Sequence, residues 1–327
     1  MWLFYIPVVA YIICLVIRYR GLSFTAVNPG MPGSGFIGEN KSLSLLQLQR
    51  HFPDKTAKTL VLPVKESITK QLALCSDFMR MNNVDYPIVL KPDFGQRGID
   101  VEIVHHQSKL RGYLENAVFD SVLQEYIEGV EFGVFYMRHA DEPEGKIFSL
   151  THKCFPAITG DGVNTVETLI CEHPRLHYMA AFLLAEHESQ LQLIPKQDEQ
   201  VNVVSLGSHC RGSLFLEGEA YGSEALSVAI EALSCAQDGF YFGRYDVRAS
   251  DIAAFQQGDI KVIEVNGVTS ESTNIYDPKY SVFTAYRVLF QQWHLAFTIG
   301  KKNILQGARP MTINDLIAKI RIMNHGV

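Results

Sequence analysis

The stretch DIKVIEVNGVTSEST, residues 259–273, places a carboxylate and a carboxamide inside an apolar strand. Val262, Ile263 and Val265 predict a buried strand, and Glu264 and Asn266 lie two residues apart within it. Side chains two apart on a strand point to the same face, so these two polar groups should lie side by side. A buried carboxylate without a partner is unfavourable, and we therefore expect a positive charge beside Glu264.

A second strand, FGRYDVR at residues 242–248, carries Asp246. If the two strands are antiparallel neighbours, Asp246, Glu264 and Asn266 form one group of oxygen ligands. Hard oxygen ligands suit Mg²⁺, which commonly shares its coordination shell with nucleotide phosphates. The two strands together predict a site for a metal ion and a nucleotide.

Two earlier stretches have features of phosphate and nucleotide binding. In PIVLKPDFGQRG, Lys91 ends an apolar strand and a glycine loop follows, made of Gly95, Gln96, Arg97 and Gly98. Such a lysine and loop can hold phosphates by charge and by backbone N–H groups. QEYIEGVE, residues 124–131, predicts a hinge strand whose backbone faces an adenine edge and whose final glutamate, Glu131, faces a ribose hydroxyl.

The order K-P…G-x-x-G, then E-Y-I-x-G-x-E, then G-R-x-D-V, then E-V-N resembles the ATP-grasp superfamily, in particular D-alanine–D-alanine ligase and its amide-forming relatives. The resemblance covers roughly residues 40–300. TGDGVNTVETLI together with VNVVSLGSHCRG is also similar to the ATP-grasp part of cyanophycin synthetase. The resemblance implies an α/β (α+β) fold in which two α+β lobes clamp ATP.

The resemblance also implies roles for individual residues. The nucleotide would contact Lys41 and Lys91 through its phosphates, the glycine loop at residues 95–98, Glu125, Tyr126 and Ile127 along the adenine, and Glu131 at the ribose. Asp246, Glu264 and Asn266 would hold two Mg²⁺ ions, with Mn²⁺ as a substitute, and Glu264 would bridge them.

Three further residues are candidates for catalysis. Lys153 would reach the γ-phosphate, and Arg244 would stabilise charge on the transferred phosphoryl group. Arg244 is alternatively an ion-pair partner of one of the acids. Arg211 is either a clamp for a substrate carboxylate or an ordinary loop arginine.

The implied activity is that of an ATP-dependent carboxylate–amine ligase that forms an amide or peptide bond through an acylphosphate and releases ADP and phosphate. Its substrates would be small-molecule or lipid-linked carboxylates and amines. Two alternatives remain: a small-molecule kinase that phosphorylates a hydroxyl, and a non-catalytic ATP-binding membrane sensor.

The sequence departs from the ligase pattern in two places. The substrate-binding lobe that those enzymes carry before the ATP-grasp lobes has no counterpart here. The ligase signature N-x-x-P-G is replaced by Asn266-Gly267-Val268-Thr269-Ser270. Both departures leave the nucleotide chemistry in place and leave the acceptor open.

The N-terminus begins with an apolar run from Trp2 to Ile17, followed by Arg18 and Arg20. Its length is at the short end of a bilayer-spanning helix, and the arginines place the following chain on the cytoplasmic side. We therefore expect a membrane-anchored protein with its catalytic domain in the cytoplasm. The alternative is a buried helix, which Pro7 favours by interrupting the run.

The patterns of apolar residues and turns predict five regions. They are an anchor at residues 1–20, a linker and short helix at 21–58, a small lobe with the glycine loop at 59–128, a large lobe with the Mg²⁺ site at 129–300, and a C-terminal tail at 301–327. The formal net charge of −6 offers no basic field for nucleic acid. The six cysteines are scattered without a metal-like spacing, which is typical of a reducing compartment.

Overall fold

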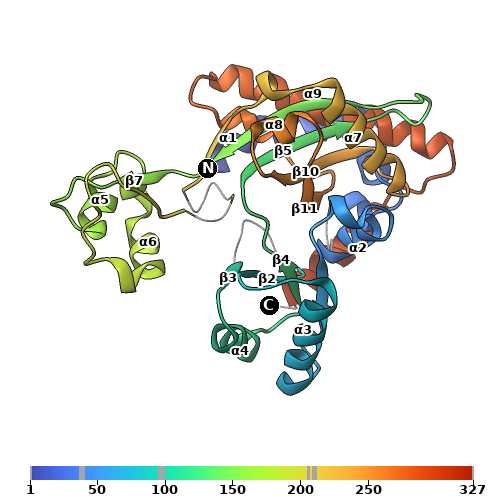
Figure 1. Ribbon diagram of the computed structural model, residues 1–327. Helices are drawn as coiled ribbons and strands as arrows, with labels where there is room; N and C mark the ends of the chain where they lie inside the picture. The colour runs from blue at the N-terminus through green and yellow to red at the C-terminus, as the bar shows by residue number, and fades with distance from the viewer. Residues whose placement is uncertain (1, 37–40, 95–99, 205–206, 208–211, 326–327) are drawn as a thin grey trace.

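A computed structural model of the chain describes residues 2–36, 41–94, 100–204, 207 and 212–325. The architecture is mixed α/β with several sheets, as the sequence predicts. Two antiparallel sheets lie one above the other in Figure 1, and a small unit projects to one side. The predicted glycine loop at residues 95–98 and the predicted clamp Arg211 lie outside the described residues.

The first sheet has four strands in the order β1-β4-β2-β3, all antiparallel. Helices α3 and α4 cover it, and a cluster of buried apolar residues fills the space between sheet and helices. The strands are β1 Thr59–Leu62, β2 Ile88–Pro92, β3 Glu102–Val104 and β4 Ser121–Glu125, and the helices are α3 Ile68–Asn82 and α4 Gln107–Asn116.

The second sheet has five antiparallel strands in the order β11-β10-β5-β6-β9. One face packs on α7, α8 and α2, and part of the other packs on α1 and α9. The strands are β5 Val130–Met137, β6 Lys146–Cys154, β9 Leu214–Glu217, β10 Phe242–Ala249 and β11 Lys261–Asn266. The helices are α1 Trp2–Tyr19, α2 Lys41–His51, α7 Glu224–Ala236, α8 Ile252–Gln256 and α9 Val282–Leu305.

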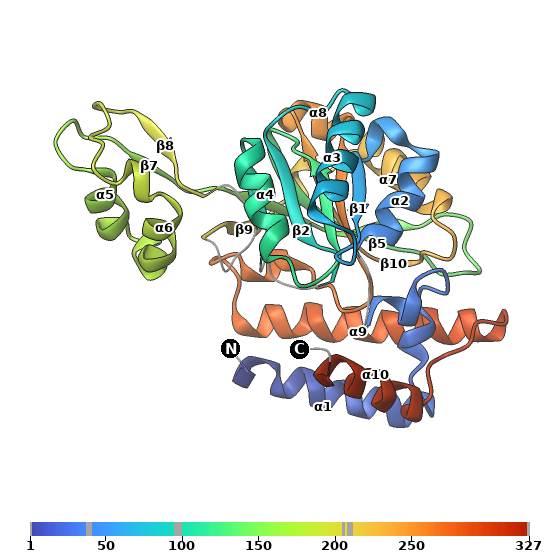
Figure 2. The same ribbon diagram turned by 90° about the horizontal axis from the view of Figure 1, so that it is seen from below.

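The projecting unit connects β6 to β9. It contains the strands β7 Ala157–Thr159 and β8 Gln200–Asn202 and the helices α5 Val166–Glu172 and α6 Ala180–Glu186. A separate apolar cluster around Ile158, Ile170 and Leu183 stabilises it. Figure 2 shows this unit standing clear of both sheets.

The prediction that residues 1–20 anchor the protein in a membrane is wrong. Residues 2–19 do form a helix, but no helix in the described part of the chain is both long and apolar enough to cross a bilayer. Instead α1 lies along α9 (Figure 2), with Val8 and Leu15 buried against the body of the protein. The same finding overturns the predicted membrane-anchored location with a catalytic domain in the cytoplasm. It also leaves the membrane without support as a partner.

The segment between α1 and α2 is tightly bound to the large sheet. Asn28 is fully buried; its side-chain amide donates to the carbonyl oxygen of Phe242, and its side-chain oxygen accepts from the backbone of Tyr241 and Phe242. These bonds fix the start of β10, which is the strand that carries Asp246. The region predicted as a C-terminal tail contains the helix α10 Ile313–His325, whose Leu316 packs against the α1–α9 cluster.

Candidate active site between the two sheets

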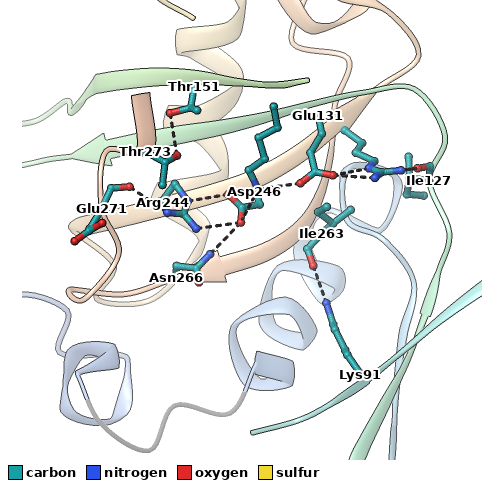
Figure 3. A network of polar contacts seen from close by, with 12 residues as sticks. Lys91, Ile127, Glu131, Thr151, Arg244, Asp246, Ile263, Asn266, Glu271 and Thr273 are labelled. Atoms are coloured by element: carbon teal, nitrogen blue, oxygen red, sulfur yellow. Dashed lines mark hydrogen bonds and ion pairs between the residues drawn. The ribbon is translucent and has the colours of Figure 1, made fainter. Parts of the chain in front are cut away.

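The polar strands singled out by the sequence are antiparallel neighbours. Asp246 of β10 lies opposite Glu264 of β11, and Arg244 lies opposite Asn266. The side-chain amide of Asn266 donates to Asp246 at 3.4 Å. The structure therefore brings the three predicted metal ligands to one end of the same pair of strands, and Figure 3 shows Asp246 and Asn266 there.

A β-bulge interrupts this pair immediately after Asp246. Val247 pairs with Val262, so Ile263 is left without a partner in the ladder. Its carbonyl oxygen instead accepts hydrogen bonds from Lys91 at 3.2 Å and from Gln124 at 3.1 Å. Bulges free backbone groups in this way, and here the freed carbonyl joins the large sheet to the small one next to Glu264.

Asp246 is the most strongly neutralised carboxylate of the site. Arg244 donates to its two oxygens at 2.8 and 3.2 Å, and Lys153 lies 3.1 Å away. Burial opposes ionisation of this 3% exposed residue, but the two cations hold the pKa of Asp246 down to about 2. The Asp246 carboxylate is therefore charged and fixed in position.

Glu131 joins the same network from β5. It accepts from Lys153 at 2.9 Å and from Arg248 at 2.9 Å, and it is 3% exposed. Burial raises the pKa of Glu131, and the Lys153 and Arg248 charges more than reverse this, so that the carboxyl stays ionised. In the structure both carboxylate oxygens of Glu131 pair with buried cations, and the contact with a ribose hydroxyl stays a prediction.

Lys153, which is predicted to reach the γ-phosphate, forms ion pairs within the large sheet. It bridges Glu131 and Asp246 and its side chain is only 4% exposed, so its charge is compensated within the large sheet. Burial lowers and the two carboxylates raise the pKa of Lys153, with a net upward shift. Arg244 likewise behaves as the ion-pair partner of Asp246, although its side chain is 14% exposed and reaches the carbonyl oxygen of Glu271 at 3.1 Å.

The polar partners of Lys91 differ from those of Lys153 and Arg244. The Lys91 side chain is buried, and its ammonium donates to the amide oxygen of Gln124 at 3.0 Å and to the Ile263 carbonyl. Among the described residues no carboxylate lies within ion-pair distance of it. Burial lowers the pKa of Lys91 to about 8, despite the more distant Glu264. As far as the structure describes the chain, neutral acceptors alone hold this lysine in place.

Lys41 approaches the same place from the start of α2. Its ammonium lies 3.6 Å from Glu264, and its backbone N–H donates to the carbonyl oxygen of Asp93. The Asp93 carboxylate accepts from the backbone and the hydroxyl of Ser42, which satisfies donors at the first turn of the helix. Lys41 and Lys91 are thus brought to one side of the site by the same short stretch.

The hinge residues lie where the two sheets meet. Glu125 pairs with Lys261 at 2.8 Å and accepts from the backbone of Lys58, so its carboxylate fastens the small sheet to β11. The carbonyl oxygen of Ile127 accepts from Arg248 at 2.7 Å, and the ring of Tyr126 lies 5.5 Å from the Arg248 guanidinium.

Sequence reasoning missed Arg248, Gln124 and Asp93. The alternation of Arg244, Asp246 and Arg248 along one face of β10 is a signal that could have identified Arg248. Gln124 directly precedes the predicted hinge residue Glu125. Its contact with Lys91 joins two different strands, so the local sequence does not predict it. The Asp93 carboxylate accepts hydrogen bonds from the first turn of α2, which lies far away in the chain.

The three predicted metal ligands offer oxygen donors at one end of β10 and β11. No group of three acidic, histidine or cysteine side chains in the described ranges is placed to hold a metal ion. Two carboxylates and a carboxamide, Asp246, Glu264 and Asn266, nevertheless meet at the end of β10 and β11, and this is the donor chemistry that Mg²⁺ prefers when phosphate oxygens complete its shell.

Comparisons with known proteins agree with the resemblance read from the motifs. No family model matches the sequence. The chain is similar to the D-alanine–D-alanine ligase of Pediococcus pentosaceus, with 37% identity over 83 residues that cover 24% of this chain and 21% of the relative. The match thus spans about a fifth of the length of that curated relative.

Solved structures of ligases are also similar. The D-alanine–D-alanine ligase of Bacillus anthracis, solved in complex with ATP, is 16% identical with a TM-score of 0.47, over 82% of this chain and 68% of that one. The bifunctional glutathione synthetase of Pasteurella multocida is 16% identical with a TM-score of 0.38, over 80% of this chain and 38% of that one.

Proposed function

We propose that this chain is an ATP-dependent ligase that joins a carboxylate to an amine through an acylphosphate. The observation that carries the proposal is the buried ammonium of Lys91, whose hydrogen-bond acceptors in the described ranges are both neutral. A buried cation without a counter-ion is unfavourable unless an anion binds there. A phosphate group of ATP, placed between Lys91 and Lys41, supplies that anion.

The segment match to a D-alanine–D-alanine ligase supports the choice of reaction class. In such a reaction the substrate carboxylate attacks the γ-phosphorus of ATP, and ADP leaves with the electrons of the broken P–O bond. The amine then attacks the acyl carbon, phosphate leaves, and the amine loses a proton. Most of the acceleration comes from positioning and from compensation of negative charge.

In the proposal, different residues of this chain bind the metal ion, orient the phosphates and position the metal ligands. Asp246, Glu264 and Asn266 would hold Mg²⁺, which neutralises phosphate charge when bound. Lys91 and Lys41 would orient the phosphates. Lys153 would fix Asp246 rather than touch the nucleotide.

Arg244 is the catalytic candidate on the large sheet, because it is more exposed than Lys153 and lies beside Asp246. In the proposal its guanidinium compensates charge on the transferred phosphoryl group. The same guanidinium contacts the backbone of Glu271 and so joins the phosphate end of the site to the segment after β11.

The test is ADP release from the full chain with Mg-ATP, scanned across pools of amino acids and small carboxylates. Glu264→Gln serves as the blank, because the Glu264 side chain is 28% exposed and the substitution keeps its shape. Release that needs both a carboxylate and an amine, and that is absent from the blank, supports the ligase. Release with a phosphorylated product and no amine requirement would instead identify a kinase.

A further inference from the structure

A cavity lies beside the proposed reaction site, between the N-terminal end of α1 and the first turn of α9. Its volume is about 250 Å³. Four aromatic side chains form its walls, Phe4, Tyr5, Tyr276 and Tyr280, and Ile275 and Ala285 close it. Such a volume accommodates the apolar body of a small molecule.

One residue, Glu271, connects this cavity to the reaction site. Its carbonyl oxygen accepts from Arg244, while its carboxylate accepts from the hydroxyls of Tyr5 at 3.0 Å and Tyr276 at 2.7 Å. Figure 3 shows the two ends of Glu271 turned in opposite directions, one toward Arg244 and one away from it. The cavity wall is therefore a single residue away from the guanidinium that contacts Asp246.

The chemistry of the wall favours a cation with an apolar body. The Tyr5 and Tyr276 hydroxyls donate to Glu271, and the Tyr280 hydroxyl and the Asn274 amide donate to Glu217. Burial and the nearby Glu271 raise the pKa of Tyr276, so this hydroxyl stays protonated. Glu271 and Glu217 lie behind the aromatic rings and do not line the cavity, so they act on a ligand through their negative charge alone. The faces of the rings also attract cations. Both effects favour a protonated amine over an anion.

The N-terminal end of α1 forms one side of the cavity. Here Phe4 and Tyr5 bring the start of α1 onto η8, the 3-10 turn Thr273–Tyr276 that follows β11. The ring of Phe4 stacks on Tyr286 of α9 at 5.0 Å, which fixes it against the body.

We propose that this cavity binds the amine substrate, that this substrate is a primary amine with an aromatic or aliphatic body, and that α1 forms one wall of the site. That the ligand is a substrate rests on the proposed ligase activity. That it is an amine rests on the aromatic wall and on the negative charge of Glu271 and Glu217 behind it.

Binding of simple probes tests the assignment without turnover. Phenethylamine, phenylacetate and ethylamine share either the ring or the ammonium, and each is titrated into the full chain by calorimetry without ATP. Phenethylamine should bind at least about tenfold more tightly than the other two, because it alone carries both a ring that packs on the aromatic wall and a positive charge that the ring faces and the nearby carboxylates attract. Equal binding of phenylacetate would overturn the assignment.

Two variants that fill the cavity locate the binding. Ala285→Leu adds bulk from the buried wall, and Val282→Trp adds it from a lining position that is 53% exposed and tolerates change. Each should weaken phenethylamine binding at least about tenfold. Phe283→Leu is the control, because Phe283 is on the same helix, is 82% exposed and does not line the cavity. Val282 is half exposed, so Val282→Trp should leave the buried residues in place. Unchanged phenethylamine binding in this variant would contradict the proposal.

The same variants separate this proposal from the ligase activity. If ADP release requires an amine and both filling variants raise the KM for that amine without changing the KM for ATP, both proposals stand. If ADP release occurs and the KM for the amine is unchanged, the cavity assignment fails and the ligase remains. If no pool gives ADP but phenethylamine binding still depends on Val282 and Ala285, the cavity is an amine site and the ligase activity fails.

Discussion

The buried charged side chains of the two sheets have different kinds of partner. On the large sheet, Asp246 and Glu131 are each compensated by two cations of the chain itself. On the small sheet, Lys91 is also buried, and its acceptors among the described residues are the neutral Gln124 amide and Ile263 carbonyl. The acids of the large sheet therefore have counter-ions within the chain, whereas Lys91 carries a charge that an anion would complement.

The largest expected effects come from removing charge on the large sheet. In Asp246→Asn, Arg244 and Lys153 lose their shared carboxylate while they remain buried. Breaking such a pair costs about 3–5 kcal/mol of unfolding free energy, and ADP release should fall about 100- to 1000-fold. Urea unfolding and the ADP assay measure both. Glu264→Gln is the matched control, with a similar loss of ADP release but little change in stability; equal destabilisation in the two variants would contradict the account.

The second prediction compares two lysines directly. Lys153→Met leaves Glu131 and Asp246 short of a cation and should cost about 3–5 kcal/mol. Lys91→Met removes a buried charge that pairs with no carboxylate in the described part of the chain, and this gain offsets the loss of its bond to Gln124. Its stability should stay within about 1 kcal/mol of the unchanged protein. If urea unfolding shows the same destabilisation for both lysines, the contrast between the sheets is wrong.

The third prediction uses the lowered pKa of Lys91. Lys91 must be protonated to hold a phosphate, and a bound phosphate raises its pKa above the value of about 8 in the free protein. ATP affinity should therefore fall about tenfold per pH unit above pH 8. The nearby Lys41 lowers this pKa, and Glu264, Asp246 and Glu131 raise it.

Calorimetric titration with ATP between pH 7 and 9.5 measures this dependence. Lys91→Arg should abolish it, because an arginine stays charged throughout. The same lowered pKa affects stability with the opposite sign. The unfolded chain binds more protons at this residue between pH 8 and its ordinary value, so the cost of burying Lys91 is greatest below pH 8 and diminishes as the pH rises.

The smallest expected effect concerns Gln124, which holds Lys91 and also donates to the Ile263 carbonyl and to Thr59. Gln124→Leu should raise the KM for ATP about threefold to tenfold, the equivalent of one lost hydrogen bond. Gln124→Glu gives Lys91 a counter-ion, and the pH dependence of ATP affinity should then move upward. A pH profile identical in Gln124→Glu and the unchanged protein would show that Gln124 does not position Lys91.

Local sequence was sufficient where a single strand determines the geometry. The two-residue spacing of Glu264 and Asn266 on an apolar strand predicted their shared face, and the neighbouring strand with Asp246 lies antiparallel to it. The mixed α/β class followed from the same alternation of strands and helices. These features depend on the periodicity of the backbone, which can be recognised from the order of polar and apolar residues.

Features that depend on distant partners were not predictable in this way. An apolar helix that packs on α9 and one that crosses a bilayer have the same hydropathy, so α1 was misassigned. The pairing of Glu131 with Arg248 joins residues 117 positions apart. The bulge that turns the Ile263 carbonyl toward Lys91 arises from the register of two strands and has no signature in either one.

Binding of Mg-ATP to the unchanged protein and to Lys91→Met, measured by calorimetry at pH 7, tests the central claim most directly. The account predicts that the unchanged chain binds ATP and that Lys91→Met, with nearly unchanged resistance to urea, binds it at least about 100-fold more weakly. Equal ATP affinity in the two proteins would contradict the claim that the buried lysine of the small sheet is the anchor for phosphate.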